Sequence, residues 1–274
     1  MRRLRILREG LSHSAQADTG LSHALLRAAD AGEAPESLRL YRPADALAFS
    51  VFDRTRPGFA RAVAISQEAG FEPIVRLAGG RAAVFERHAL AFAWTVPARE
   101  ARAGIRARFE ALSSRLARAL CALGVDARVG EVAGEYCPGE FSINARGQVK
   151  LVGVGQRVIR RAAHVGGVTL IEEAPRISEV LERVYRELDY PLDSSRTGAV
   201  AEEIPGATAD DVGDALIAEL AGDFELEFVG LEDLAPSVWS AMNELAPRHA
   251  ATVPRPGEAP MPGIGTKTSA PLDP

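Results

Sequence analysis

The sequence predicts an α/β fold in which a mixed or antiparallel sheet is flanked by helices. Short apolar runs recur along the chain, and Gly, Pro and Arg turns bound them as turns bound strands. Longer segments carry apolar residues at helical spacing. With 274 residues, 47% of them hydrophobic, the chain can bury the core of one large domain with a small appendage.

The predicted helices and strands alternate up to residue 171, and helices dominate after that point. Leu21, Ala24 and Leu25 share one helical face, Gly32 is a suitable C-cap, and Thr208 is a suitable N-cap. Helices are predicted over residues 15–31, 57–69, 99–123, 176–188, 207–221 and 232–248. Strands are predicted over residues 38–42 and 47–52, three within 71–97, one over 126–130, three within 136–171, and an edge strand over 225–229.

We expect four segments along the chain. Residues 1–14 form a basic arm or a short strand, residues 15–190 form the main domain, and residues 191–250 form a C-terminal helical extension. Residues 251–274 form a disordered tail, because six prolines in this stretch prevent it from building a core.

Composition excludes several classes of function. The net charge of −5 gives no general attraction to nucleic acid. Cys121 and Cys137 form neither a disulfide framework nor a metal-binding pattern, so no metal site and no permanently bound cofactor are expected. No apolar segment is long enough to span a membrane, and no apolar run follows the basic start as in a signal peptide. We therefore expect a cytoplasmic protein without a nucleic-acid or membrane partner.

One lysine is the first candidate for a functional residue. Of the 32 basic residues only Lys150 and Lys267 are lysines, and Lys150 lies in the middle of a predicted strand. Strict alternation puts it on the apolar face of Val152 and Val154, where a lysine is costly unless paired. The other face then carries glycines 153 and 155, which often mark the close approach of a ligand. The alternative is a lysine whose head reaches solvent at a strand end.

A glycine loop is the second candidate. The segment RLAGGR, residues 76–81, places Arg76 and Arg81 on either side of Gly79 and Gly80. Glycines let backbone N–H groups approach an anion, and guanidinium groups suit a phosphate or a carboxylate. The alternative is an ordinary hairpin loop with solvated arginines.

With both motifs in view, the sequence resembles the lipoate–protein ligase and octanoyltransferase family, which shares its catalytic fold with biotin–protein ligases. The matching segments are LRLYRP, RLAGGRAAVFE, KLVGVGQRV and HVGGVTLI, and the resemblance runs from about residue 17 to residue 217. Lys150 matches the family's catalytic lysine in a Lys-x-x-Gly-x-x-Gln pattern. Two positions depart from the family: Ala78 stands where Ser is usual, and Phe85 with Glu86 where His-Asp is common.

The resemblance implies an acyl site, a protein partner and site residues. The lysine would contact the acyl carbonyl, and the glycine loop would shape the acyl tunnel or a phosphate site. The partner would be a lipoyl domain of 2-oxoacid dehydrogenase E2 subunits or the glycine-cleavage H protein, with acyl carrier protein as a further candidate. The residues expected to line the acyl or nucleotide site are Arg76, Gly79, Gly80, Arg81, Ala82, Ala83, Val84, Gly153 and Gln156.

Two chemistries remain open within the family. The segment YCPG, residues 136–139, resembles the cysteine loop of the lipoyl amidotransferase branch, so Cys137 would accept a lipoyl or octanoyl group as a thioester with assistance from Lys150. In the alternative, an ATP- and Mg-dependent lipoate–protein ligase, Lys150 holds the acyl-adenylate and Cys137 has only a structural role. A third hypothesis is a non-catalytic paralogue that binds an acyl group or a carrier domain.

Overall fold

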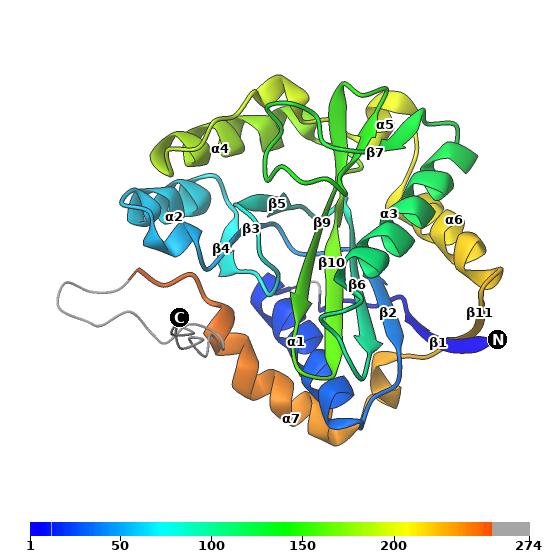
Figure 1. Ribbon diagram of the computed structural model, residues 1–274. Coiled ribbons are helices and arrows are strands. Elements are labelled where there is room, and N and C mark those ends of the chain that lie inside the picture. The colour runs from blue at the N-terminus through cyan, green and yellow to red at the C-terminus, as the bar shows by residue number, and fades with distance from the viewer. Residues whose placement is uncertain (12, 254–274) are drawn as a thin grey trace, which may run out of the picture.

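The computed structural model describes residues 1–11 and 13–253, and shows two sheets with helices on both sides (Figure 1). Within these residues the larger sheet has eight strands in the order β11-β1-β2-β6-β10-β9-β8-β7, and the smaller has three in the order β4-β3-β5. The larger sheet is mixed. Strand β1 runs parallel to β11 and β2, whereas the neighbouring strands in the series β2-β6-β10-β9-β8-β7 pair antiparallel. The predicted fold class is confirmed.

The elements have the following bounds. The strands are β1 (Arg2–Leu7), β2 (Ser37–Tyr41), β3 (Ala46–Phe49), β4 (Glu72–Val75), β5 (Ala83–Phe85), β6 (Leu90–Pro97), β7 (Ala127–Val129), β8 (Ile143–Ala145), β9 (Val149–Val158), β10 (Ala162–Thr169) and β11 (Phe224–Phe228). The α-helices are α1 (Ala15–Ala31), α2 (Phe59–Glu68), α3 (Ile105–Ala122), α4 (Ala174–Glu187), α5 (Val200–Glu203), α6 (Ala209–Ala221) and α7 (Pro236–Leu245). The 3-10 helices are η1 (Asp53–Thr55), η2 (Ser194–Arg196), η3 (Leu231–Asp233) and η4 (Ala246–His249).

Most predicted helices are present, and two have different limits. Gly32 caps α1 in the left-handed conformation, and Thr208 caps α6, as the sequence predicts. The helix predicted over residues 99–123 begins only at Ile105, because Gly104 occupies the N-cap position. The helix predicted over residues 232–248 is divided into η3, α7 and η4. Pro236 opens α7 at its first turn, where proline is tolerated, and proline is disfavoured farther along a helix.

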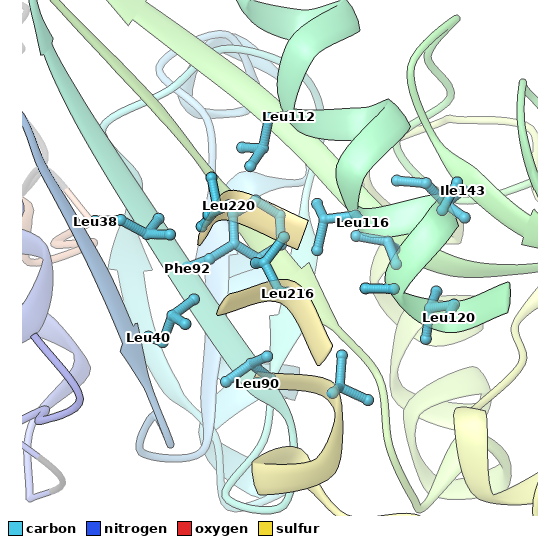
Figure 2. Packing of buried hydrophobic residues seen from close by; sticks show 14 of the residues in the cluster. Leu38, Leu40, Leu90, Phe92, Leu112, Leu116, Leu120, Ile143, Leu216 and Leu220 are labelled. Atoms are coloured by element: carbon cyan, nitrogen blue, oxygen red, sulfur yellow. The ribbon is translucent and has the colours of Figure 1, made fainter. Parts of the chain in front are cut away.

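One face of the large sheet packs against α3 and α6 to form the main core (Figure 2). Strand residues alternate between the two faces of a sheet, so every second side chain reaches this core. The core is made by residues of β2 and β6, of α3 and of α6, among them Leu38, Leu40, Leu90, Phe92, Leu112, Leu116, Leu120, Leu216 and Leu220. This side fixes the sheet and leaves the opposite face for other contacts.

The opposite face of the large sheet is lined with small residues, and this creates space. In the ladder, Gly155 of β9 pairs with Gly166 of β10, Gly166 pairs with Ala93 of β6, and Ala93 pairs with Arg39 of β2. Directly paired residues share a face of the sheet, so this row crosses four strands on one face. The row carries a large side chain only at its β2 end, where Arg39 lies. Helix α1 and the small sheet with α2 and α4 cover this side (Figure 1).

A β-bulge in β9 corrects the predicted alternation around Lys150. Asn144 pairs with Lys150 but Ile143 pairs with Val152, so β9 contains one extra residue at Leu151. A bulge of this kind puts two consecutive side chains on nearly the same side. Leu151 and Val152 both lie in the main core as a result. Lys150 therefore shares the face of Gly153, not that of Val152, and an added Cβ at Gly153 would lie 3.5 Å from its Cε.

Both ends of the described chain contact the main domain. Residues 2–7 adopt the strand alternative as β1, which lies between β11 and β2. Helix α7 packs on α1 through Val238, Met242 and Leu245. The division at residues 14, 190 and 250 stays a prediction, and the predicted tail lies outside the described residues from residue 254 onward. None of the described helices is both long and apolar enough to cross a membrane.

Candidate active site

A pocket opens between α1, the small-residue face of the sheet, and two loops. It encloses about 820 Å³ including its open mouth. Most of its lining is apolar, with Cys137 and Arg76 among the polar exceptions. Gly79 and Gly80 are exposed, so the glycine loop lies at the protein surface beside Cys137. The lining residues include Ile74, Arg76, Ala78, Ala83, Phe85, Tyr136, Cys137, Gly153, Gly155 and Val168.

The sulfur of Cys137 accepts two hydrogen bonds from the glycine loop. Arg76 Nη2 donates to Sγ at 3.1 Å, and the backbone N–H of Arg81 donates at 3.2 Å. Gly80 makes this approach possible, because it has φ +109° and an added Cβ would lie 2.7 Å from Sγ and 2.0 Å from Arg76 Nη2. A side chain at residue 80 would therefore displace the sulfur or the guanidinium.

These contacts favour the thiolate form of Cys137. Burial raises the pKa of the thiol, but the charges of Arg76 and Lys150 and the N–H of Arg81 together lower it below its ordinary value. A thiolate, and not a thiol, is the nucleophile in cysteine chemistry. The site therefore presents an activated sulfur at an apolar pocket.

Tyr185 of α4 holds the backbone of the cysteine loop. Cys137 adopts the left-handed conformation with φ 41°, which is uncommon for a residue with a side chain. Its N–H donates to Tyr185 Oη at 2.6 Å, and that hydroxyl donates to the carbonyl oxygen of Ala82 at 2.8 Å. Burial raises the pKa of Tyr185 well above its ordinary value, so the hydroxyl keeps its proton. Tyr185 therefore joins the cysteine loop to the strand that follows the glycine loop.

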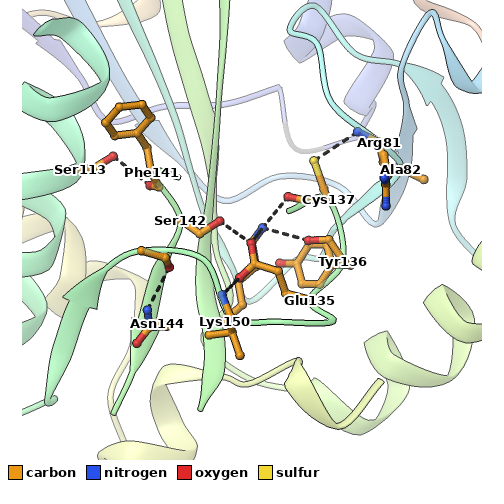
Figure 3. Close-up of polar contacts among 12 residues, drawn as sticks. Arg81, Ala82, Ser113, Glu135, Tyr136, Cys137, Phe141, Ser142, Asn144 and Lys150 are labelled. Carbon is orange, nitrogen blue, oxygen red and sulfur yellow. Dashed lines mark hydrogen bonds and ion pairs between the residues drawn. The ribbon is translucent and has the colours of Figure 1, made fainter. Parts of the chain in front are cut away.

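Lys150 lies below the same loop and is fully paired (Figure 3). Its Nζ donates to Glu135 Oε1 at 2.9 Å, to the Tyr136 carbonyl at 2.9 Å and to the Cys137 carbonyl at 2.8 Å. Both charged side chains are buried, with Lys150 1% and Glu135 0% exposed. Glu135 is itself fixed by Ser142 Oγ and by the N–H of Val132. The three donors of the lysine thus hold the loop that carries Cys137.

The predicted site residues fall into three groups. Arg76, Ala83, Cys137 and Gly153 line the pocket. Arg81 is bonded to Cys137 through its N–H, and Gly79 O would lie 3.5 Å from a Cβ added to Gly155. The remaining predicted residues also lie outside the lining: Lys150 is below the loop, Gly80 is at the surface with Gly79, Gln156 is beside α3, and Ala82 and Val84 are in the core beneath the small sheet.

Gln156 is occupied by contacts away from the pocket. Its Oε1 accepts from Arg108 Nε at 2.8 Å, and its Nε2 donates to the carbonyl of Ile105 at 3.1 Å. Both of these partners belong to α3. The structure therefore places Gln156 in a contact between β9 and α3.

Three further residues organise this site, and none of them is among those predicted from the sequence. Glu135 directly precedes the YCPG segment and pairs with Lys150. A buried lysine requires a partner of this kind. The sequence therefore indicated that Lys150 needs a partner, but not which residue it is. Tyr185 has the spacing of an ordinary core residue in an amphipathic helix. Asp18 lines the pocket from α1, and nothing in the helix pattern distinguishes it.

The chain is similar to known proteins of one family. The family described as lipoyl protein ligase A/B catalytic domain matches residues 15–221. An octanoyl-[GcvH]:protein N-octanoyltransferase from Geobacillus kaustophilus is 27% identical over 150 residues, which cover 55% of this chain and 51% of the relative. A protein of the same name from Anoxybacillus flavithermus is 29% identical over 161 residues, covering 59% and 56%. The chain thus spans about half the length of the curated relatives it matches.

A solved structure shares the fold across most of both chains. The crystal structure of a lipoate-protein ligase A bound with ATP superposes with a TM-score of 0.73 at 20% identity, covering 92% of this chain and 97% of the other. At this identity the likeness establishes the fold. The family match spans most of the chain and confirms the resemblance seen in the motifs. The chain therefore belongs to the lipoyl protein ligase A/B catalytic domain family.

Proposed function

We propose that the protein transfers octanoyl or lipoyl groups to a specific lysine of a carrier protein through a thioester on Cys137. The acceptor is a lipoyl domain or the glycine-cleavage H protein, and the names of the two relatives point to octanoyl-loaded H protein as donor. The observation that carries the proposal is the position of Cys137, whose sulfur lies at an apolar pocket between two hydrogen-bond donors. An acyl carrier protein, which the sequence left open, has no support from these names.

The first chemical step is attack of the Cys137 thiolate on the acyl carbonyl of the donor lysine. A C–S bond forms, the amide C–N bond breaks, and the amine leaves with one proton taken up from solvent. Arg76 and the N–H of Arg81 are the donors at the reacting sulfur. They are placed to stabilise negative charge that develops next to it.

The second step returns the enzyme to its starting state. The neutral amine of the acceptor lysine attacks the thioester, a C–N bond forms, and the C–S bond breaks to give the thiolate again. The acceptor amine releases one proton, which balances the proton taken up in the first step. One amide is exchanged for another, so this route needs no ATP.

Lys150 supports this reaction through the position of the loop and through its charge. All three of its donors are used by Glu135 and by two loop carbonyls. Direct contact with an acyl oxygen, as the sequence predicts, requires it to release one of these acceptors. We therefore assign Lys150 as a positioning residue that also lowers the pKa of the Cys137 thiol.

The ATP-dependent ligase remains a second candidate because of the cations near the mouth. Arg81 and Arg56 both lie over the Tyr190 ring, 4.7 and 5.1 Å from its centre, and their charges suit a phosphate. Magnesium fits less well. Asp53 beside this cluster is buried, and its oxygens are used by Tyr190 Oη and by the N–H of Ser50. In residues 1–11 and 13–253 no group of three acidic, His or Cys side chains could hold a metal.

The test is transfer with purified full-length protein, octanoyl-loaded H protein and an unmodified lipoyl domain, with and without ATP. We expect transfer without ATP, and an octanoyl adduct on Cys137 by mass spectrometry. Cys137→Ala removes both. Cys121→Ala is the matched control, because Cys121 is an exposed cysteine on α3, and this variant keeps full activity. ATP-dependent transfer that survives Cys137→Ala would establish the ligase instead.

A further inference from the structure

The deep end of the pocket is polar, although the acyl groups of the proposed reaction end in apolar atoms. Arg39 Nη2 donates to Asp18 Oδ1 at 2.5 Å, and Arg39 Nη1 donates to Ser22 Oγ at 3.1 Å. The guanidinium lies over the ring of Tyr41, 4.4 Å from its centre. Asp18, Ser22 and Tyr41 line the same pocket as Cys137, and all are at most 9% exposed.

The strand ladder places this polar group far from the sulfur. Lys150 of β9 holds the Cys137 carbonyl, whereas Arg39 and Tyr41 belong to β2. Strands β10 and β6 lie between β9 and β2. Three strand spacings amount to about 14 Å. The row between them contains only glycine and alanine on the pocket face, and the ring of His164 lies against Gly166 of this row.

Three buried polar atoms at this end have no hydrogen-bond partner among the described residues. They are Asp18 Oδ2, Arg39 Nε and His164 Nδ1. His164 lines the pocket, is 6% exposed, and its ring lies so close to Gly166 that an added Cβ there would be 2.5 Å from Nε2. Buried polar atoms are nearly always paired, so each unpaired one needs an explanation.

Together the three atoms offer an acceptor, a donor and a group that can do either. Burial, with the charges of Arg39 and His249, lowers the pKa of His164 to about 4, so the ring is neutral near pH 7 and Nδ1 can donate or accept. Arg39 is fully buried and is not among the lining residues, so a hydroxyl or a thiol in the pocket would donate to Asp18 Oδ2 and accept from His164 Nδ1. A methyl group can do neither and would leave all of them unpaired.

We propose that the deep end of this pocket selects acyl chains that carry a hydroxyl or thiol at their distal end over methyl-terminated chains. The inference rests on the proposed function, because it takes Cys137 as the reacting end. It refines the substrate from any eight-carbon acyl group to one with a hydrogen-bonding tail, such as 8-hydroxyoctanoyl or the reduced dithiol form of lipoyl. A site built to bond a substrate hydroxyl discriminates strongly against the analogue that lacks it.

The first test measures binding alone, so that it does not depend on turnover. Octanoate, 8-hydroxyoctanoate and dihydrolipoate are titrated calorimetrically into the intact protein. We expect the two polar-tailed acids to bind about 10-fold more tightly than octanoate or better. Equal or weaker binding overturns the inference, and is the result expected if ordered water alone satisfies the three atoms.

Variants on one strand show whether the deep end causes the preference. His164→Phe keeps a ring but removes Nδ1, and reduces the ratio of polar-tailed acid to octanoate affinity to about 3-fold or less. Thr169→Val is the matched control, because Thr169 lies on the same strand with a buried unpaired hydroxyl outside the pocket. An unchanged preference in His164→Phe, or an equal loss in Thr169→Val, contradicts the inference.

The second test separates this inference from the proposed function. H protein loaded with octanoyl or with 8-hydroxyoctanoyl is offered as donor to the wild-type enzyme. Transfer of both with no difference in kcat/KM retains the proposed function and overturns tail selection. A binding preference without any transfer retains tail selection and overturns the acyltransferase proposal.

Discussion

Lys150 Nζ lies 2.8 Å from the carbonyl oxygen of Cys137 and donates to it, so the lysine supports the backbone of the cysteine. The same nitrogen pairs with buried Glu135, and neither side chain is more than 1% exposed. A buried ion pair is costly to break from one side, because the remaining charge has no partner. The cysteine loop and the stability of the fold therefore depend on the same contact.

Lys150→Met should destabilise the protein by about 3–5 kcal/mol, because it leaves Glu135 buried without a counter-charge. The measurement is the free energy of unfolding in urea. The double variant Lys150→Met with Glu135→Gln should recover much of that loss, since neither charge remains. Equal stability of the single variant and the wild type would show that the pair does not form.

Gly80→Ala should reduce acyl transfer about 10-fold or more while the protein stays folded. An added methyl would lie 2.7 Å from Cys137 Sγ, at a residue with φ +109°. Gly79→Ala is the matched control, because an added Cβ there has no neighbour within 4 Å, and its activity should stay close to wild type. The comparison requires kcat/KM with circular dichroism on both variants. Equal effects of the two substitutions would contradict the geometry.

Tyr185→Phe should lower stability by about 1–3 kcal/mol and slow transfer, because the Cys137 N–H and the Ala82 carbonyl both lose their partner. Tyr136→Phe provides the control, since the buried Tyr136 hydroxyl has no partner and its removal should change stability by less than about 0.5 kcal/mol. Denaturant unfolding gives both values. A larger loss for Tyr136→Phe than for Tyr185→Phe would refute the assigned role.

The alkylation of Cys137 should have a pH midpoint below that of an ordinary thiol, which is about 8.5. The thiolate fraction rises as the pH increases through the pKa of the folded state, so iodoacetamide reactivity rises at lower pH than in a model peptide. The experiment uses a Cys121→Ser background, in which Cys137 is the remaining thiol. Arg76→Gln should move the midpoint upward, because the guanidinium favours the thiolate. An unchanged midpoint in Arg76→Gln would exclude that contribution.

Stability should fall as the pH rises from about 5 to about 8 because of Glu86. This side chain is fully buried, and burial raises its pKa to about 7. A carboxyl group whose pKa is raised in the folded state stabilises below its unfolded pKa, and this contribution is lost as pH rises through about 7. Glu86→Gln should remove this slope, and the difference between variant and wild type isolates it from the histidines. Parallel pH profiles for the two proteins would exclude the effect.

Most helices and strands, the glycine loop and the YCPG segment could be predicted from the sequence. The tertiary contacts between these segments could not. The glycine loop and the YCPG segment were both recognised, and the structure brings Arg76 and Arg81 to Cys137. The partner of Lys150 was not predictable, because Glu135 reaches it only when its loop folds back over β9. Tertiary contacts of this kind leave no local pattern.

The bulge explains why strict alternation assigned Lys150 to the wrong face of β9. Alternation within a strand can be counted from sequence, but an extra residue is visible only in the pairing with the neighbouring strand. The predicted role of Gln156 stays a prediction, and its observed contacts were hidden from the sequence for a related reason. Its amide was free to be assigned to a ligand until α3 was placed beside it.

The extra residue at Leu151 also determines how this protein can be altered without loss of the pocket. Deletion of that single residue would restore a regular strand in which Lys150 and Gly153 are two positions apart, so the lysine end and the glycine end of β9 would keep their common face. If the bulge were lost at the present strand length, either Lys150 would leave its carboxylate, or the valines would replace Gly153 and Gly155 and fill the acyl site. Evolution of a new acyl preference is therefore free to exchange side chains on the pocket floor, but must either keep the bulge or shorten the strand by the one residue that the bulge contains.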